Sequence, residues 1–413
     1  MRSTTHSDSK LAAVSLSNGG TLLRRLVLTL ALASIALAAC GGGSAASPPA
    51  SAATAPPASG AAGAPQILPI FVSSEILAGK NRFLFSLTDR ANNVVAAPDV
   101  PVALEWYDVA AAPDQVAFTS DARFLWAIEG QKGLYAADVE FPTAGRWGVR
   151  FTASFPDGRS EQVRADFDVA AAGSTPAIGA PAISVDTPTA ADVGGDLAKV
   201  STDTAPNPAF YQTSVADALS AKEPFVLVFA TPAFCQTAIC GPMLDNVKAV
   251  AADYPTLTFI NVEPYKMVFA DGRLQPELAD GQLQAAVWTD AWGLRTEPWI
   301  FVVDGSGKVT AKFEGAVAKD ELTAAFDAVA PSTGRATGIV IAVDQPSITQ
   351  VNSFTLRTDA GAELVFGVGP LDLTDGGFNA GHLREHMTTG TAINVAFEVA
   401  ESRPIATKLT DAN

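Results

Sequence analysis

An apolar run that leads directly into two cysteines constrains this chain more than any other feature. Residues 224–230 are almost entirely apolar, which is typical of a buried strand. Apolar residues at helical spacing follow from Leu244, so Cys235 and Cys240 are expected where a strand passes into a helix. The amino end of a helix presents N–H groups and a positive dipole end, which favour a thiolate. Because the thiolate attacks disulfides, peroxides and metals, we predict that this stretch is the working site.

Length and charge limit the classes of protein to which the chain can belong. Its 413 residues are enough for about two to four domains. The formal net charge is −16, and no basic stripe is present that could neutralise phosphates. We therefore predict that nucleic acid is not a partner.

The N-terminus has the pattern of a targeting segment. Two arginines precede the apolar run 26–39, which is short for a membrane span. The run ends in small residues followed by Cys40, and this resembles the lipobox of bacterial lipoproteins. The resemblance implies a signal peptide over 1–39 and lipidation of Cys40, which would anchor an extracytoplasmic chain to a membrane. The Gly/Ser/Ala/Pro-rich residues 40–65 are expected to form a flexible tether. The alternative is an ordinary signal peptide with an unlipidated cysteine.

The number of cysteines favours redox or metal chemistry. There are three in all, so lipidation of Cys40 would leave Cys235 and Cys240 as the only exported thiols. A structural disulfide framework would need more cysteines, spread along the chain. The alternative is a local disulfide that only pins a loop, although so short a loop gains little from closure.

The first folded region is predicted to be an immunoglobulin-like β-sandwich over 66–170. Its short runs alternate apolar and polar residues and are separated by turn signals such as 156–158. Segments 79–83 and 144–149 resemble immunoglobulin-like modules of the YtkA and FixH type. We expect three tryptophans to pack in the core or rim rather than to form a binding face: Trp106, Trp126 and Trp147.

The middle region alternates helical and strand patterns over 209–330, after an Ala/Gly/Pro/Thr-rich linker over 171–208. Residues 264–282 break the pattern and are expected to form an insertion loop. The segments 226–235 and 292–308 resemble the thioredoxin family.

The thioredoxin resemblance implies an α/β thioredoxin-like domain and roles for three residues near the cysteines. Pro298 would be the cis-proline that lies beside the reactive cysteine and receives substrate backbone. Phe234 and Glu297 flank this site and are candidate substrate-binding residues, although an exposed Glu297 without a role is the simpler expectation.

The cysteine spacing departs from the thioredoxin pattern. Four residues separate Cys235 from Cys240, where that family has two. A second alignment uses 240–243, so either cysteine could be the nucleophile. Five positions along an ideal helix turn side chains about 140° apart, so the segment must unwind for a disulfide to close.

The last region, 335–413, alternates like strands and predicts a small β-barrel crossed by a short helix over 380–387. His382 and His386 would share a face of that helix. A metal site needs a third or fourth ligand, and none is obvious in the sequence. We therefore predict a solvated helix face and no metal site.

These features together predict a multidomain chain: a β-sandwich, an α/β thioredoxin-like domain and a small C-terminal β-barrel. The leading function is membrane-tethered thiol–disulfide exchange without a cofactor, in which Cys235 attacks a disulfide of a protein substrate or redox partner and Cys240 resolves the mixed disulfide. The first alternative is a copper chaperone similar to the Sco type, with Cu(I) on the two thiolates. The second is a thiol peroxidase in which Arg295 stabilises the thiolate. The third is a surface scaffold without redox activity.

Overall fold

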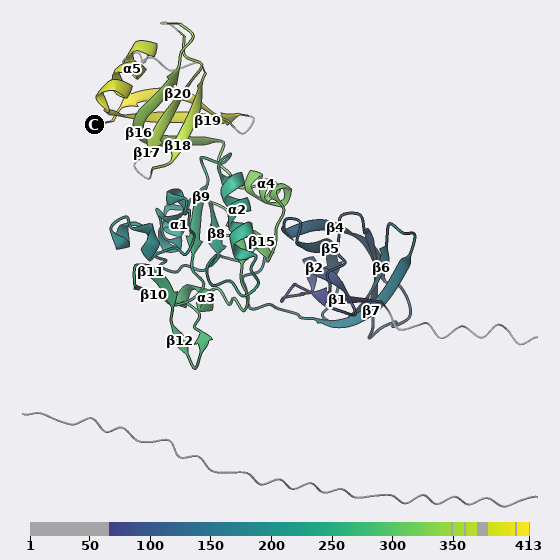
Figure 1. The fold of residues 1–413 in the computed structure, drawn as a ribbon. Helices are drawn as coiled ribbons and strands as arrows, with labels where there is room; N and C mark the ends of the chain where they lie inside the picture. Colours follow the sequence, from purple (N-terminus) through teal and green to yellow (C-terminus); the bar gives the residue numbers. More distant parts are fainter. Residues whose placement is uncertain (1–65, 348–349, 359–360, 370–378, 401–402, 413) are drawn as a thin grey trace, which may run out of the picture. The chain divides into compact units, whose positions relative to one another are not determined.

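The chain is predominantly β (Figure 1): strands hold 45% and helices 16% of the described residues. The structure is a computed structural model and describes residues 66–347, 350–358, 361–369, 379–400 and 403–412. The predicted signal peptide, Cys40 and tether lie outside these residues. None of the described helices has the length and apolar content that a bilayer span needs.

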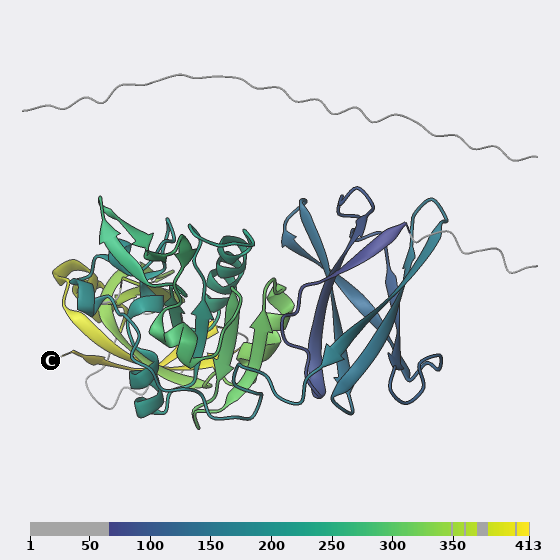
Figure 2. The ribbon, with the colours of Figure 1, turned by 90° about the horizontal axis from the view of Figure 1, so that it is seen from below.

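The first region is an antiparallel sheet of seven strands in the order β1-β2-β5-β4-β3-β6-β7. Figure 2 draws these strands in purple to blue. Alternating apolar side chains form one aromatic-rich core in which Trp106 and Trp147 are buried. The strands are β1 (Ile67–Phe71), β2 (Gly79–Asp89), β3 (Val102–Asp108), β4 (Phe118–Ile128), β5 (Lys132–Phe141), β6 (Gly145–Ser154) and β7 (Ser160–Val169).

The middle region has a four-stranded sheet in the order β15-β14-β8-β9. Its strands are β8 (Phe225–Phe229), β9 (Thr258–Val262), β14 (Trp299–Val303) and β15 (Val309–Glu314). Every residue of β8 is buried, because successive side chains enter two apolar cores on opposite faces. In the register, β8 pairs parallel with β9 and antiparallel with β14, which places Trp299 opposite Phe229. The end of β8 therefore lies beside the start of β14.

The predicted fold class is wrong, because the chain is mostly β and shows no clear α/β thioredoxin fold. Short helices and extra strands in the middle region account for part of this difference. Its helices are α1 (Val215–Ala221), α2 (Cys240–Ala251), α3 (Val287–Ala291) and α4 (Lys319–Asp327), with 7, 12, 5 and 9 residues.

The segment predicted as an insertion loop, 264–282, instead forms two small hairpins, the second of which ends at residue 283. They are β10 (Met267–Ala270) with β11 (Arg273–Pro276) and β12 (Leu278–Ala279) with β13 (Gln282–Leu283). Asp271 and Asp280 have positive φ at the two turns, each followed by a glycine, and this turn chemistry explains why strands form there.

The segment predicted as a linker, 171–208, packs against the middle region. Val200 is buried in the core cluster that also contains Val226 and Val228 of β8. The 3₁₀ turns are η1 (Ala191–Val193), η2 (Leu197–Lys199) and η3 (Pro208–Tyr211).

The last region is a closed barrel in the order β16-β17-β18-β20-β19. Its strands are β16 (Thr333–Asp344), β17 (Ser353–Thr358), β18 (Glu363–Val368), β19 (Ala392–Ala400) and β20 (Arg403–Asp411). Helix α5 (Ala380–Thr389) precedes β19 and contributes Leu383 to the barrel core.

Candidate functional site at the Cys235–Cys240 disulfide

The two cysteines lie on the connection between β8 and α2. Helix α2 begins at Cys240, four residues earlier than the apolar pattern indicates. Pro242 is tolerated in its first turn, where a backbone N–H has no helical partner to lose. The preceding residues are irregular, and Ala238 has a φ of 64°, in the left-handed region.

Cys235 and Cys240 form a disulfide with a Cα–Cα distance of 5.9 Å. Because Cys235 precedes the helix, the pair avoids the divergence that an ideal helix would impose. Cys240 is fully buried, whereas Cys235 is only partly buried. An attacking group from outside therefore reaches the Cys235 sulfur first.

Two donors lie against the Cys235 sulfur. The backbone N–H of Cys240 donates to Cys235 Sγ at 3.2 Å, and the Thr237 hydroxyl lies 3.3 Å from the same sulfur. The Cys240 N–H is also at the amino end of α2, where the helix dipole is positive. These contacts would stabilise a negative charge on Cys235 when the disulfide opens.

Glu297 lies just before β14, and its carboxylate reaches the cysteine loop. The Glu297–Pro298 peptide bond is cis. The carboxylate accepts hydrogen bonds from the Gln236 N–H at 2.8 Å and from the Tyr265 hydroxyl at 2.7 Å. Burial, together with this contact to Glu297, raises the pKa of Tyr265, so its hydroxyl stays a donor. The simpler expectation of an exposed Glu297 is wrong, since its exposed fraction is only 8%.

Two other residues named from the sequence are Phe234 and Arg295. Phe234 directly precedes Cys235 and is partly buried. Arg295 is exposed, and among the described residues the hydrogen bonds to the Cys235 sulfur come from Cys240 and Thr237, not from Arg295.

The structure also brings together a set of atoms that could bind a metal after reduction. The two sulfurs and a carboxylate oxygen of Glu297 lie within 4.8 Å of one another. Two thiolates suit Cu(I), whereas a carboxylate suits harder ions. From the sequence, Glu297 was predicted only as a substrate contact, and nothing indicated that it could be a third metal ligand beside the two cysteines.

Sequence reasoning missed one buried carboxyl group next to the cysteine loop. Glu263 directly follows β9, and its exposed fraction is 4%. Burial raises the pKa of Glu263 to about 7, even though a hydrogen bond from the Thr202 N–H at 2.6 Å acts to lower it. The Thr202 hydroxyl in turn accepts from the Ala233 N–H at 3.3 Å. The signal in the sequence that could have identified it is an acidic residue directly after the apolar run 256–262.

Comparison with known proteins adds little. No family model matches the chain, and no curated protein matches it. One similar solved structure is MtrC from Shewanella baltica OS185, at 11% sequence identity, with 84% of this chain and 67% of MtrC covered and a TM-score of 0.19. A similarity at that score carries no argument about function.

Proposed function

We propose that this chain carries out thiol–disulfide exchange at Cys235 and Cys240. The observation that carries the proposal is the asymmetry of the pair. A partly buried Cys235 sulfur receives a backbone N–H, and it is bonded to a fully buried Cys240 at the start of α2. Exchange needs one sulfur that is open to attack and stabilised as a thiolate, and a second that is held close by.

The exchange has two balanced steps. In the reduced chain, the Cys235 thiolate attacks one sulfur of a protein disulfide, and the other substrate sulfur leaves as a thiolate. The Cys240 thiolate then attacks Cys235, the intramolecular disulfide forms, and the second substrate sulfur leaves as a thiolate. Two electrons pass from the chain to its substrate, and the reverse sequence oxidises a dithiol.

The test separates the roles of the two cysteines. Cys40 is replaced by Ser in every sample, so that no third thiol takes part. With oxidised glutathione, Cys240→Ser is expected to accumulate a mixed disulfide on Cys235, because the resolving thiol is missing. Cys235→Ser is expected to react much more slowly, because the Cys240 sulfur is buried. The proposal would be refuted if the two variants formed mixed disulfides with glutathione equally fast. It would also be refuted if the wild-type disulfide stayed closed in every glutathione buffer.

The proximity of the Cys235 and Cys240 sulfurs supports Cu(I) binding by the reduced chain as a second candidate function. Its distinguishing result is one Cu(I) per reduced chain that protects both thiols from alkylation. A redox transition that is unchanged by Cu(I) would leave exchange as the function.

We also propose that the exchange takes place outside the cytoplasm, on a chain anchored to a membrane through Cys40. The apolar run 26–39 and the small residues before Cys40 support this placement. Metabolic labelling with a radioactive fatty acid tests it: labelling is expected in the wild type and not in Cys40→Ser. Equal labelling of both would refute lipidation at that residue.

A further inference from the structure

The C-terminal barrel brings two histidines and an aspartate together, outside the cysteine site. His382 and His386 lie one turn apart on α5, and Asp411 is the last residue of β20. The prediction of a solvated helix face is wrong for His386, whose exposed fraction is 5%. The sequence suggests no third ligand because Asp411 lies 25 residues or more beyond the histidines and meets them only when the barrel closes.

The distances among these three side chains fit one shared ion. Asp411 Oδ1 lies 2.9 Å from His386 Nε2 and 3.7 Å from His382 Nε2. Two ligands at ordinary Zn–N and Zn–O distances around a tetrahedral ion are about 3.3 Å apart. The two observed separations bracket that value, and the ligand atoms of all three residues lie within 4.8 Å of one another.

A second contact fixes how the His386 ring is presented. Its Nδ1 lies 2.9 Å from the carbonyl oxygen of Thr391. A carbonyl oxygen can only accept, so Nδ1 carries the proton and donates. In the neutral ring Nε2 is then an acceptor, and it faces the acceptor Oδ1 of Asp411 at 2.9 Å. Two acceptors at that distance need a cation between them, either a proton or a metal ion.

The surrounding fold holds the site in place. The side chain of Asn379 accepts from the N–H groups of Gly381 and His382 and so caps α5. Leu383, between the histidines, is buried in the barrel core. Metal-binding histidines usually donate a hydrogen bond from their second ring N–H to a carboxylate, a backbone carbonyl or water, as His386 does to Thr391.

We propose that His382, His386 and Asp411 bind one divalent transition-metal ion, of which Zn²⁺ is the representative. Imidazole nitrogen together with carboxylate oxygen suits ions of this borderline class better than Ca²⁺ or Mg²⁺. Three protein ligands leave room for water or for a further ligand. This site is independent of exchange at the cysteines.

Zinc binding to the full chain tests the proposal. The Cys235–Cys240 disulfide is kept closed and Cys40 is alkylated, so that no thiol competes for the ion. Calorimetry is expected to find one Zn²⁺ per chain, with micromolar or tighter affinity. Nitrogen-detected NMR of the histidine rings is expected to show that Zn²⁺ shifts His382 and His386 and leaves His6, the only other histidine, unchanged.

Two variants at accessible positions carry the mutational test, because removal of the buried His386 could unfold the barrel. Asp411→Asn and His382→Ala are each expected to weaken Zn²⁺ binding at least about tenfold. Glu398→Gln, an exposed carboxylate on the neighbouring β19, is the matched control and is expected to bind as the wild type does. No binding to the wild type, or equal binding by Asp411→Asn and the control, would overturn the proposal and leave a protonated His386 paired with Asp411.

Discussion

Replacement of Glu263 by Gln is expected to stabilise the middle region above neutral pH and to have little effect in acid. Burial raises the pKa of Glu263 to about 7, and the negative charge of Asp203 adds to the effect. The unfolded chain therefore releases this proton near pH 4.5, whereas the folded chain holds it until about pH 7. The stability that the protonated group contributes is fully present below pH 4.5 and is lost as the pH rises through 7.

The magnitude follows from the two pKa values. The difference between 4.5 and about 7 corresponds to about 3 kcal/mol between pH 4 and pH 8. Glutamine does not titrate, and its amide oxygen can still accept from the Thr202 N–H. The free energy of unfolding of Glu263→Gln, relative to the wild type, should therefore rise by about this amount across that range.

The assay must report on the middle region alone, because a chain with several domains does not unfold in one step. Pulsed hydrogen exchange of the peptide that contains β9, along a guanidinium series at several pH values, meets this need. Glu277→Gln, at an exposed position, is the matched control and is expected to give a flat difference. A flat difference for Glu263→Gln as well would refute the reasoning, as would an NMR titration that places the Glu263 pKa near 4.5.

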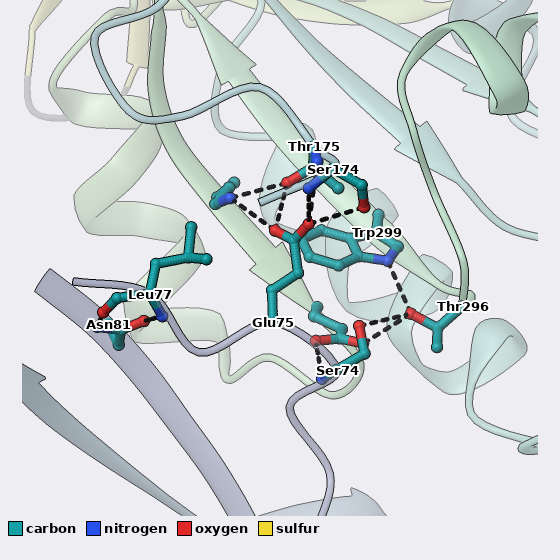
Figure 3. A network of polar contacts seen from close by, with 10 residues as sticks. Ser74, Glu75, Leu77, Asn81, Ser174, Thr175, Thr296 and Trp299 are labelled. Atoms are coloured by element: carbon teal, nitrogen blue, oxygen red, sulfur yellow. Dashed lines mark hydrogen bonds and ion pairs between the residues drawn. The ribbon is translucent and has the colours of Figure 1, made fainter. Parts of the chain in front are cut away.

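Three further substitutions test other contacts. Burial raises the pKa of Glu75, but hydrogen bonds from Thr175 and Ser174 (Figure 3) and the charge of Lys312 lower it to about 2. Glu75→Gln should therefore lower the free energy of unfolding by about 2 kcal/mol at pH 7 and leave it unchanged below pH 2. Denaturation at each pH measures this. A Cβ at Gly293 would overlap the Ser174 carbonyl oxygen, so Gly293→Ala should lower stability by more than about 2 kcal/mol, and by more than Gly194→Ala, which has positive φ but open space. Tyr265→Phe removes a donor from the buried Glu297 and should cost about 1–3 kcal/mol in the same assay; an unchanged midpoint would show that the bond contributes nothing.

Local patterns in the sequence predict the strands of the middle sheet better than its class. The apolar run 224–230 corresponds to β8 (Phe225–Phe229), because a strand buried on both faces needs an unbroken apolar run. By contrast, helix α3 (Val287–Ala291) has only five residues, and Gln282–Leu283 shortly before it pair as a strand with Leu278–Ala279. Periodicity over so few residues does not separate a short helix from a short hairpin, and this accounts for part of the wrong fold class.

Side-chain environments depended on residues that are distant in the sequence. Glu297 looked exposed because an acidic residue usually is, yet its partners Gln236 and Tyr265 lie 61 and 32 positions away. Asp411 joined the histidines only through closure of the barrel. Such contacts follow from the register of strands, which a single sequence does not specify in advance.

The seven-stranded sheet contributes directly to the shape of the cysteine loop. Ile239, the residue before Cys240, is buried in an apolar cluster whose other members include Leu84 of β2 and Leu125 of β4. Lys132 of β5 donates to the carbonyl oxygen of Thr237 at 3.1 Å. The loop thus has an anchor from another sheet on the Cys240 side, while the Cys235 side has the contacts of Gln236 to Glu297 and Tyr265. Since a loop that is held at both ends loses less entropy when its disulfide closes, the first region is part of what keeps the two sulfurs in bonding range.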